Sequence, residues 1–222
     1  MTKAEVKARI EAIGIIPGVR VSKPNHAHFA AEMVVKAGIP IVEITMTVPH
    51  AIDVIAQLAK SHPDLVVGAG TVLDVETALR CVDVGAKFLT SPGLVTEVVE
   101  FAVKNDITVF PGALTPTEVI RAWKTGADYV KVFPCAPVGG ATYIKSLKVP
   151  LPQIQLIASG GVNQTTATGF IVAGSTALGL GAELIPHQAL ELHQEDRIQE
   201  LARRFLGMVK EGRAQIARAN GI

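Results

Sequence analysis

The sequence has little cysteine, little net charge and no long apolar run, and each shortage argues against a class of protein. Two cysteines, Cys81 and Cys135, cannot build a disulfide framework and stand in no C-x-x-C pair, which favours a reducing cytoplasm. Lys and Arg number 21 against 20 Asp and Glu, so we expect neither a nucleic-acid nor an anionic-membrane partner. No window approaches the roughly 18 uninterrupted apolar residues of a membrane span, and the charged N-terminus predicts an amphipathic helix rather than a signal peptide.

Histidine is also sparse, and its positions form no metal-ligand pattern. His26 and His28 are two residues apart and therefore lie on different sides of a helix, and no H-E-x-x-H cluster appears. Cys135 has no histidine base in its motif context, so we interpret it as a loop residue rather than a nucleophile. We expect no metal and no other cofactor.

What the sequence does contain is enough apolar side chain for one large core. Of its 222 residues 49% are hydrophobic and only 18% are charged, which is typical of globular proteins. The length falls within the roughly 200 to 250 residues that barrels occupy as one domain. No linker or low-complexity segment divides the chain, so we expect a single domain over residues 1–222.

Short apolar runs alternate with helical patterns along the whole chain. Most runs are nearly continuous in Val, Ile and Leu, which is typical of parallel strands covered on both faces. The expected strands are 15–21, 41–46, 65–71, 88–92, 108–113, 129–134, 154–160 and 176–181. These βα units, preceded by an extra N-terminal helix, predict an α/β fold, a closed (β/α)8 TIM barrel. An open flavodoxin-like sheet is the alternative, although it normally has about five or six strands and a phosphate loop after the first.

Signals at the helix ends support this division. Residues 115–118, Thr-Pro-Thr-Glu, combine a cap, a first-turn proline and a capping-box glutamate, and Asp74 and Asn163 can cap the helices that follow them. A glycine stands just before several expected strands, where a helix would end in a left-handed residue. These glycines are Gly38, Gly85, Gly126 and Gly174.

Glu43 is the first candidate for chemistry, because the active site of such a barrel forms at the C-terminal ends of its strands. Alternation along residues 41–47 puts Glu43, Thr45 and Thr47 on one face of the strand. We therefore expect Glu43 to point into the barrel. A structural ion pair with an Arg or Lys is the alternative, because charges are rarely buried without a partner or a task.

Lys131 is a sharper signal, since it stands between Tyr129 and Phe133 on the inward face of an otherwise apolar strand. Removal from water favours the neutral amine, which is the form that attacks a carbonyl carbon. A structural ion pair between Lys131 and Glu43 is the alternative. The two interpretations are compatible.

Several loops offer groups that bind anions. Glycine-rich turns at 159–162 and 179–183 follow the last two expected strands, where such barrels commonly hold phosphate through backbone N–H groups. Plain tight turns are the alternative for both. Elsewhere, Thr71 offers a hydroxyl and Arg20 a guanidinium to an anion, or else both satisfy loop carbonyls.

In order and spacing, these segments resemble the 2-keto-3-deoxy-6-phosphogluconate (KDPG) and 4-hydroxy-2-oxoglutarate (KHG) aldolase family. The resemblance spans residues 15–210. It is carried by residues 42–47, 68–72, 91–92, 110–112, 115–118, 130–134 and 159–162. The resemblance implies a homotrimeric class I aldolase that needs no metal, with Lys131 as the Schiff-base lysine and Glu43 as the general acid and base.

The resemblance also implies the substrate and the residues that hold it. The expected substrate is KDPG, a phosphorylated 2-oxo acid that is cleaved to pyruvate and glyceraldehyde 3-phosphate. The expected substrate-binding residues are Arg20, Thr47, Thr71, Pro92, Phe133, Ser159, Gly160, Gly161, Gly181 and Ala182. Among them, Arg20 and Thr71 would hold the carboxylate end, and the glycines and Ala182 would face the phosphate.

Two positions depart from the family pattern. Many members have an arginine where this chain has Thr47, so Arg20 is expected to take over anion binding. Many also have a phosphate-site serine where this chain has Ala182, which leaves that contact to backbone N–H groups.

Other functions stay open at this point. KHG and 2-keto-3-deoxy-6-phosphogalactonate (KDPGal) are alternative substrates, because they differ from KDPG by a missing phosphate or by one hydroxyl configuration. A non-catalytic barrel that binds a phosphorylated ligand is the alternative of a different class, with Lys131 and Glu43 as a structural pair.

Overall fold

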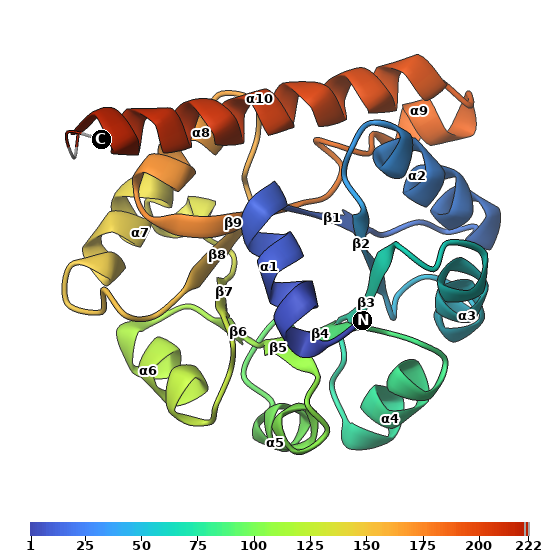
Figure 1. Cartoon of the computed structure of the whole chain (residues 1–222), viewed down its shortest axis with the longest axis horizontal. Coiled ribbons are helices and arrows are strands. Elements are labelled where there is room, and N and C mark those ends of the chain that lie inside the picture. The colour runs from blue at the N-terminus through green and yellow to red at the C-terminus, as the bar shows by residue number, and fades with distance from the viewer. Residues whose placement is uncertain (220, 222) are drawn as a thin grey trace.

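A nearly closed ring of parallel strands lies at the centre of the computed structural model, which describes residues 1–219 and 221 (Figure 1). The strands are β1 (Ile15–Val19), β2 (Ile41–Thr45), β3 (Val66–Gly70), β4 (Phe88–Thr90), β5 (Thr108–Phe110), β6 (Gly112–Ala113), β7 (Val130–Val132), β8 (Leu156–Ser159) and β9 (Ser175–Leu180). Their order in the sheet is β5-β4-β3-β2-β1-β9-β8-β7-β6. The predicted TIM barrel is therefore confirmed.

The ninth strand arises because the predicted fifth strand is divided at Pro111. β5 pairs with β4 and β6 pairs with β7, so these two short strands are the ends of the sheet and a single residue joins them. Proline has no N–H for a ladder bond, but the Pro111 carbonyl accepts a hydrogen bond from the Lys131 N–H at 2.9 Å. The interruption at Pro111 therefore lies where the ring closes. The hydrogen bond to its carbonyl holds β7 at this position.

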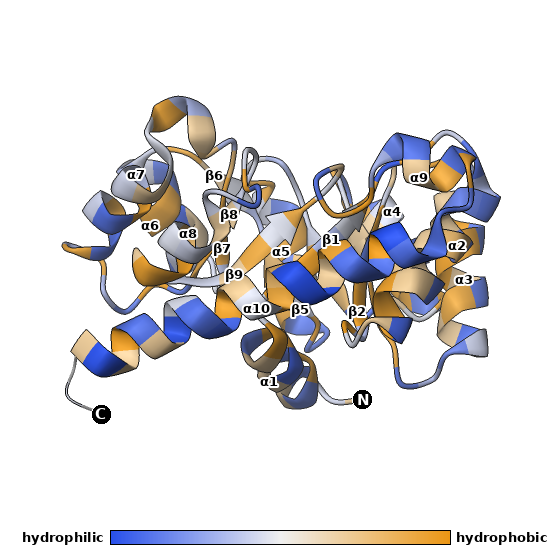
Figure 2. Ribbon diagram, turned by 90° about the horizontal axis from the view of Figure 1, so that it is seen from above, coloured by the Kyte–Doolittle hydropathy of each residue, from blue (hydrophilic) through white to orange (hydrophobic). Residues whose placement is uncertain are grey.

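Helices surround the ring. They are α1 (Lys3–Ile13), α2 (Pro24–Lys36), α3 (Ala51–Ser61), α4 (Val75–Asp83), α5 (Thr96–Lys104), α6 (Pro116–Lys124), the 3-10 turn η1 (Ala136–Val138), α7 (Gly140–Lys148), α8 (Ala167–Val172), α9 (His187–Glu191) and α10 (Glu195–Ala219). The long helix α10 alternates between apolar and polar residues (Figure 2) and buries Ile198, Ala202, Phe205 and Val209 on one face. Among the described helices none is both long enough and apolar enough to cross a membrane.

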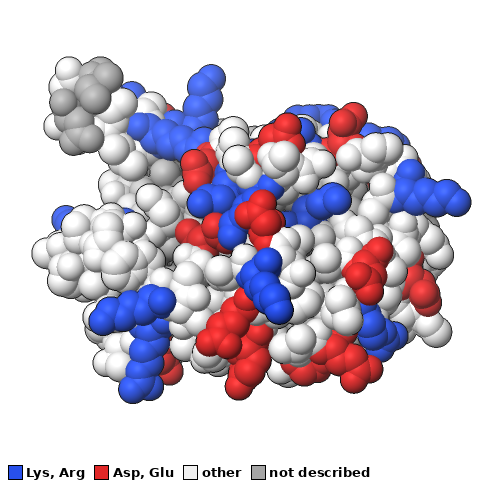
Figure 3. Space-filling model, turned by 60° about the horizontal axis from the view of Figure 1, so that its bottom comes forward, with Lys and Arg blue, Asp and Glu red and all other residues white. Residues whose placement is uncertain are grey.

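The surface drawn in Figure 3 carries cationic and anionic side chains in alternation. No field of one sign dominates this face, so it offers a polyanion no continuous cationic surface.

The predicted helix ends hold at most positions. The Asp74 carboxylate accepts the Thr77 N–H at 2.7 Å, and Thr115 with Glu118 forms a capping box. The Asn163 side chain accepts the N–H groups of Thr165 and Thr166, and its carbonyl accepts the Ala167 N–H at 3.0 Å, so it caps the turn that leads directly into α8. The four glycines before strands have φ between 99° and 111°, as a left-handed helix end requires.

The N-terminal helix α1 lies across the end of the barrel opposite the site described below (Figure 1) and holds the start of β7. The amines of Lys3 and Lys7 lie 3.0 and 3.3 Å from the Asp128 carboxylate. The Tyr129 hydroxyl donates to the Glu11 carboxylate at 2.8 Å. Both contacts fix the residues that immediately precede the strand carrying Lys131.

Replacing Asp128 with alanine should therefore destabilise the fold. The Asp128 side chain is 7% exposed and also accepts the Val109 N–H at 3.0 Å. Its loss leaves that donor and two lysines without their acceptor, which we expect to lower the free energy of unfolding by about 1 to 3 kcal/mol. Urea unfolding measures this, with the exposed Asp64→Ala as the matched control, expected within about 0.5 kcal/mol of the unchanged protein. An equal loss in both variants would contradict the anchoring role of Asp128.

Candidate active site

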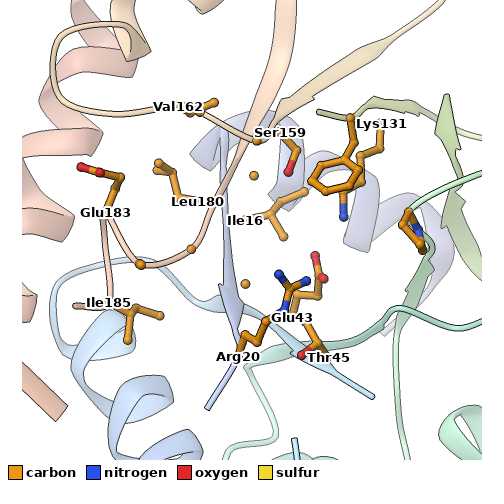
Figure 4. Close-up of a pocket in the computed structure, with 18 of the residues that line it drawn as sticks. Ile16, Arg20, Glu43, Thr45, Lys131, Ser159, Val162, Leu180, Glu183 and Ile185 are labelled. Atoms are coloured by element: carbon orange, nitrogen blue, oxygen red, sulfur yellow. The ribbon is translucent and has the colours of Figure 1, made fainter. Parts of the chain in front are cut away.

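A cavity of about 500 Å³ lies at the C-terminal ends of the strands and brings together most of the predicted site residues (Figure 4). The predicted residues that line it are Arg20, Glu43, Thr71, Pro92, Lys131, Phe133, Ser159, Gly160, Gly161, Gly181 and Ala182. They come from β2, β7 and β8 and from the loops that follow six of the strands. The closed ring therefore gathers side chains that are more than a hundred residues apart in the sequence.

The Lys131 amine points into this cavity from β7. The side chain is half-buried, and its Nζ lies 5.5 Å from the centre of the Phe133 ring. Within the described residues it donates no side-chain hydrogen bond and joins no ion pair. The amine is therefore free to react with a bound molecule.

The Glu43 carboxylate faces the same cavity from the middle of β2, a strand whose residues are all buried. Glu43 is only 6% exposed. In the part of the chain that the structure describes, no cation lies within ion-pair distance of it, Lys131 included. A structural ion pair thus does not account for this buried carboxylate.

The hydroxyl groups of Thr45 and Thr47 form hydrogen bonds at the ends of β1 and β2, and only one of the two residues lines the cavity. The Thr45 hydroxyl donates to the Val19 carbonyl at 3.1 Å, and the Thr47 hydroxyl lies 2.7 Å from that of Thr45. Thr45 lines the cavity, but Thr47 lies outside its lining. β2 ends at Thr45 and the chain turns there, so the strand alternation does not extend to Thr47. Arg20, which follows Val19, has its guanidinium on the Glu43 side of the cavity (Figure 4).

Thr71 has a strained backbone at the end of β3. Its φ is 60°, a left-handed value that is unfavourable for a β-branched residue. Such strain costs about 1 to 3 kcal/mol and collects at functional sites. The strained turn places Thr71 in the cavity lining.

The loop after β8 is shaped by two glycines in left-handed conformations, Gly160 at φ 81° and Gly161 at φ 93°. The Gly160 carbonyl accepts from the Ala136 N–H at 2.9 Å and from the Cys135 thiol at 3.3 Å. Burial raises the pKa of the Cys135 thiol to about 11, so the thiol stays protonated at neutral pH. The Cys135 thiol therefore supports the loop after β8, and its protonated state agrees with its interpretation as a loop residue rather than a nucleophile.

Backbone N–H groups without a hydrogen-bond acceptor lie on the side of the cavity formed by the loops after β8 and β9. Within the described residues, the N–H groups of Gly161, Val162, Ala182 and Glu183 donate no hydrogen bond. These residues belong to the two loops after β8 and β9. Unpaired N–H groups on two loops that line the same cavity can bind an anion without a cationic side chain.

Sequence reasoning missed part of the lining. Beyond Thr45 and the glycine-rich turns at 159–162 and 179–183, the additional residues are Ile16, Gly18, Val21, Asn163, Ile185 and His187. Strand alternation with Arg20 could have found Ile16 and Gly18. No pattern pointed to Ile185 or His187, because the loop into α9 has no periodicity.

Together, an unpaired amine and an unpaired carboxylate in one enclosed site can form a covalent bond to a carbonyl carbon and move protons around it. No group of three or more His, Cys, Asp or Glu side chains among residues 1–219 and 221 is placed to hold a metal ion.

Comparisons with known proteins agree in family and in fold. Residues 6–201 match the family model for KDPG and KHG aldolase. The KHG/KDPG aldolase of Escherichia coli K12 is 31% identical over 189 residues, which are 85% of this chain and 89% of that protein. A 2-dehydro-3-deoxy-phosphogluconate aldolase of Pseudoalteromonas atlantica is 30% identical over 85% of this chain and 88% of its own length.

Solved structures match as well. KDPG aldolase from Legionella pneumophila, with pyruvate captured at low pH as a covalent carbinolamine intermediate, has a TM-score of 0.82 and 28% identity over 89% of this chain and 96% of that one. A native KDPGal structure has a TM-score of 0.82 and 32% identity over 89% of this chain and 95% of that one.

Proposed function

Because the chain belongs to the KDPG and KHG aldolase family, we propose that it is a class I aldolase that cleaves KDPG to pyruvate and glyceraldehyde 3-phosphate without a metal. One observation carries the proposal: the unpaired Lys131 amine and the unpaired, buried Glu43 carboxylate face one cavity. The related Legionella structure, in which pyruvate is captured as a covalent carbinolamine, supports a covalent route through an amine.

The reaction begins at Lys131. Its neutral amine attacks the C2 keto carbon to give a carbinolamine, and loss of water leaves a protonated imine. Glu43 then takes the proton of the C4 hydroxyl while the C3–C4 bond breaks, and the electron pair of that bond moves toward the imine nitrogen. The aldehyde leaves and an enamine remains. Protonation at C3 and addition of water release pyruvate and regenerate the Lys131 amine.

The rest of the cavity holds the two ends of the substrate. Arg20 and Thr71 bind the carboxylate, the former through its guanidinium and the latter through its hydroxyl. The phosphate faces the loops after β8 and β9, where the Gly161 and Ala182 N–H groups are free. Pro92, Phe133, Ser159, Gly160 and Gly181 complete the walls.

A panel of 2-oxo acids tests this function by coupling the released pyruvate to lactate dehydrogenase. We expect KDPG to give the highest kcat/KM. A higher value for KHG or KDPGal would reassign the substrate within the family. No pyruvate from any 2-oxo acid would favour the non-catalytic binding barrel.

The phosphate site predicts that KDPG is preferred over its unphosphorylated analogue in kcat/KM, because remote binding energy positions the reacting carbons. Ala182→Asp places a carboxylate beside the phosphate, and like-charge repulsion should lower kcat/KM for KDPG about 10-fold or more. Ala182→Asn is the neutral control of matched size and should lose far less. Equal kcat/KM for both substrates in the unmodified protein would contradict a working phosphate site and favour a KHG type of aldolase.

We further propose that residues 1–222 form one domain that assembles as a homotrimer in the cytoplasm. Exposed apolar side chains just before α4 and along it, namely Leu73, Val75 and Leu79, support an interface. A cube-shaped cage designed by fusing symmetric oligomeric domains contains a chain that matches this one with a TM-score of 0.85 and 30% identity, over 94% of this chain and 76% of that one. Both cysteines are free and buried, which suits a reducing compartment.

A further inference from the structure

We propose that Gly70 is a positioning residue for Glu43, because its missing β-carbon leaves the space in which the Glu43 carboxyl group lies. The inference rests on the proposed function, since the position of this carboxylate matters only if Glu43 transfers the substrate's proton. Gly70 itself touches no reacting atom and acts through Glu43.

The contact between the two residues crosses the β2–β3 pair. Thr45 is the register partner of Gly70, and Glu43 stands two residues before Thr45 on the same face of β2. A β-carbon built on Gly70 would overlap Oε1 of Glu43 and lie 2.6 Å from its Cδ and 2.7 Å from its Cγ. The carboxyl group therefore rests directly on the β3 backbone.

The backbone conformation does not explain the glycine. The φ of Gly70 lies outside the left-handed region, so an L side chain would fit the strand geometry there. Glycine in a strand interior weakens the strand and often marks a close approach by another group. Here the approaching group is the Glu43 carboxyl.

The wall that supports the carboxyl group is also fixed. The Gly70 carbonyl accepts the Met46 N–H at 2.8 Å, which locks the end of β3 to the end of β2. If a methyl group were added at Gly70, the flexible end of Glu43 would move and the backbone would stay in place. The added methyl should therefore misplace the carboxylate in a protein that still folds.

Gly68, two residues earlier on the same strand, provides the contrast. A β-carbon there would overlap the ring of Phe88, which is fully buried in the core. Gly68 therefore serves core packing, and Gly68→Ala should lower the thermal unfolding temperature through Phe88. The two glycines differ in the side chain for which they leave room.

The test is a double-mutant cycle with Gly70→Ala and Glu43→Ala. Misplacing a catalytic group by about 1 Å can cost about 10²-fold, so we expect Gly70→Ala to lower kcat for KDPG about 10- to 100-fold and to change KM far less. Borohydride trapping of pyruvate on Lys131 should persist, because the amine is untouched. In the Glu43→Ala background, adding Gly70→Ala should cost no more than about 2-fold, since the side chain it displaces is already gone.

Each outcome of the cycle is informative. Additive losses, or a Gly70→Ala variant with unchanged kcat, would overturn the positioning role while leaving the role of Glu43 intact. Full turnover in Glu43→Ala alone would overturn the proton-transfer role of Glu43 and the positioning role with it. If Gly70→Ala fails to fold, the double variant decides: recovery of the fold supports the clash with Glu43, and failure of the double variant to fold overturns it.

Discussion

Replacing Lys131 with alanine is expected to lower KDPG turnover by about 10⁴-fold or more, the scale that follows loss of a covalent nucleophile. Without the amine no imine forms, and the electron pair of the breaking C3–C4 bond has no acceptor. The fold should survive, because Lys131 has no ion-pair partner in the described chain that its loss would leave unpaired. Pyruvate release measures the effect, with circular dichroism to verify folding.

Lys148 supplies the control for this variant. Burial lowers the pKa of the Lys148 amine below its ordinary value, so it is a rival nucleophile by ionisation alone. Its amine, however, donates to the carbonyls of Pro152 and Ile154, each at 2.8 Å, and it lies outside the cavity lining. Lys148→Ala should keep most of the turnover. Comparable losses in the two variants would contradict the assignment of Lys131.

Replacing Glu43 with glutamine is expected to lower kcat about 10²-fold or more, the usual scale for loss of a general acid or base. The amide keeps the size and shape of the buried side chain but cannot take the C4 hydroxyl proton. Trapping of pyruvate on Lys131 should continue, which separates proton transfer from imine formation. Glu118→Gln, in the capping box of α6 outside the cavity, is a matched control for the chemical change. Near-normal kcat in Glu43→Gln would reject the proton-transfer role.

The inward positions of Glu43 and Lys131 could be predicted because strand alternation is a local property. β2 and β7 are short parallel strands covered on both faces, so a charged residue within them has only the barrel interior to face. The barrel itself followed from the repeated βα pattern, and the resemblance to a family supplied the roles of the two residues.

Three other features of the fold and site could not be predicted, because they depend on how segments far apart in the sequence meet in space. The division of the fifth strand follows from how Pro111 meets β7 across the closing seam. Thr47 lies outside the lining because β2 stops at Thr45, two residues before the alternation seen in the sequence ends. The space that Gly70 leaves for Glu43 is a contact between two strands, and no pattern within either strand shows it.

The central claim is that Lys131 forms the imine, and covalent trapping tests it most directly. The protein is incubated with pyruvate and cyanoborohydride, digested, and its peptides are mapped by mass spectrometry. The account predicts one reduced pyruvyl group, located on the peptide that contains Lys131 and missing from the Lys131→Ala protein. An adduct on another lysine such as Lys148, or labelling that persists unchanged in Lys131→Ala, would contradict it.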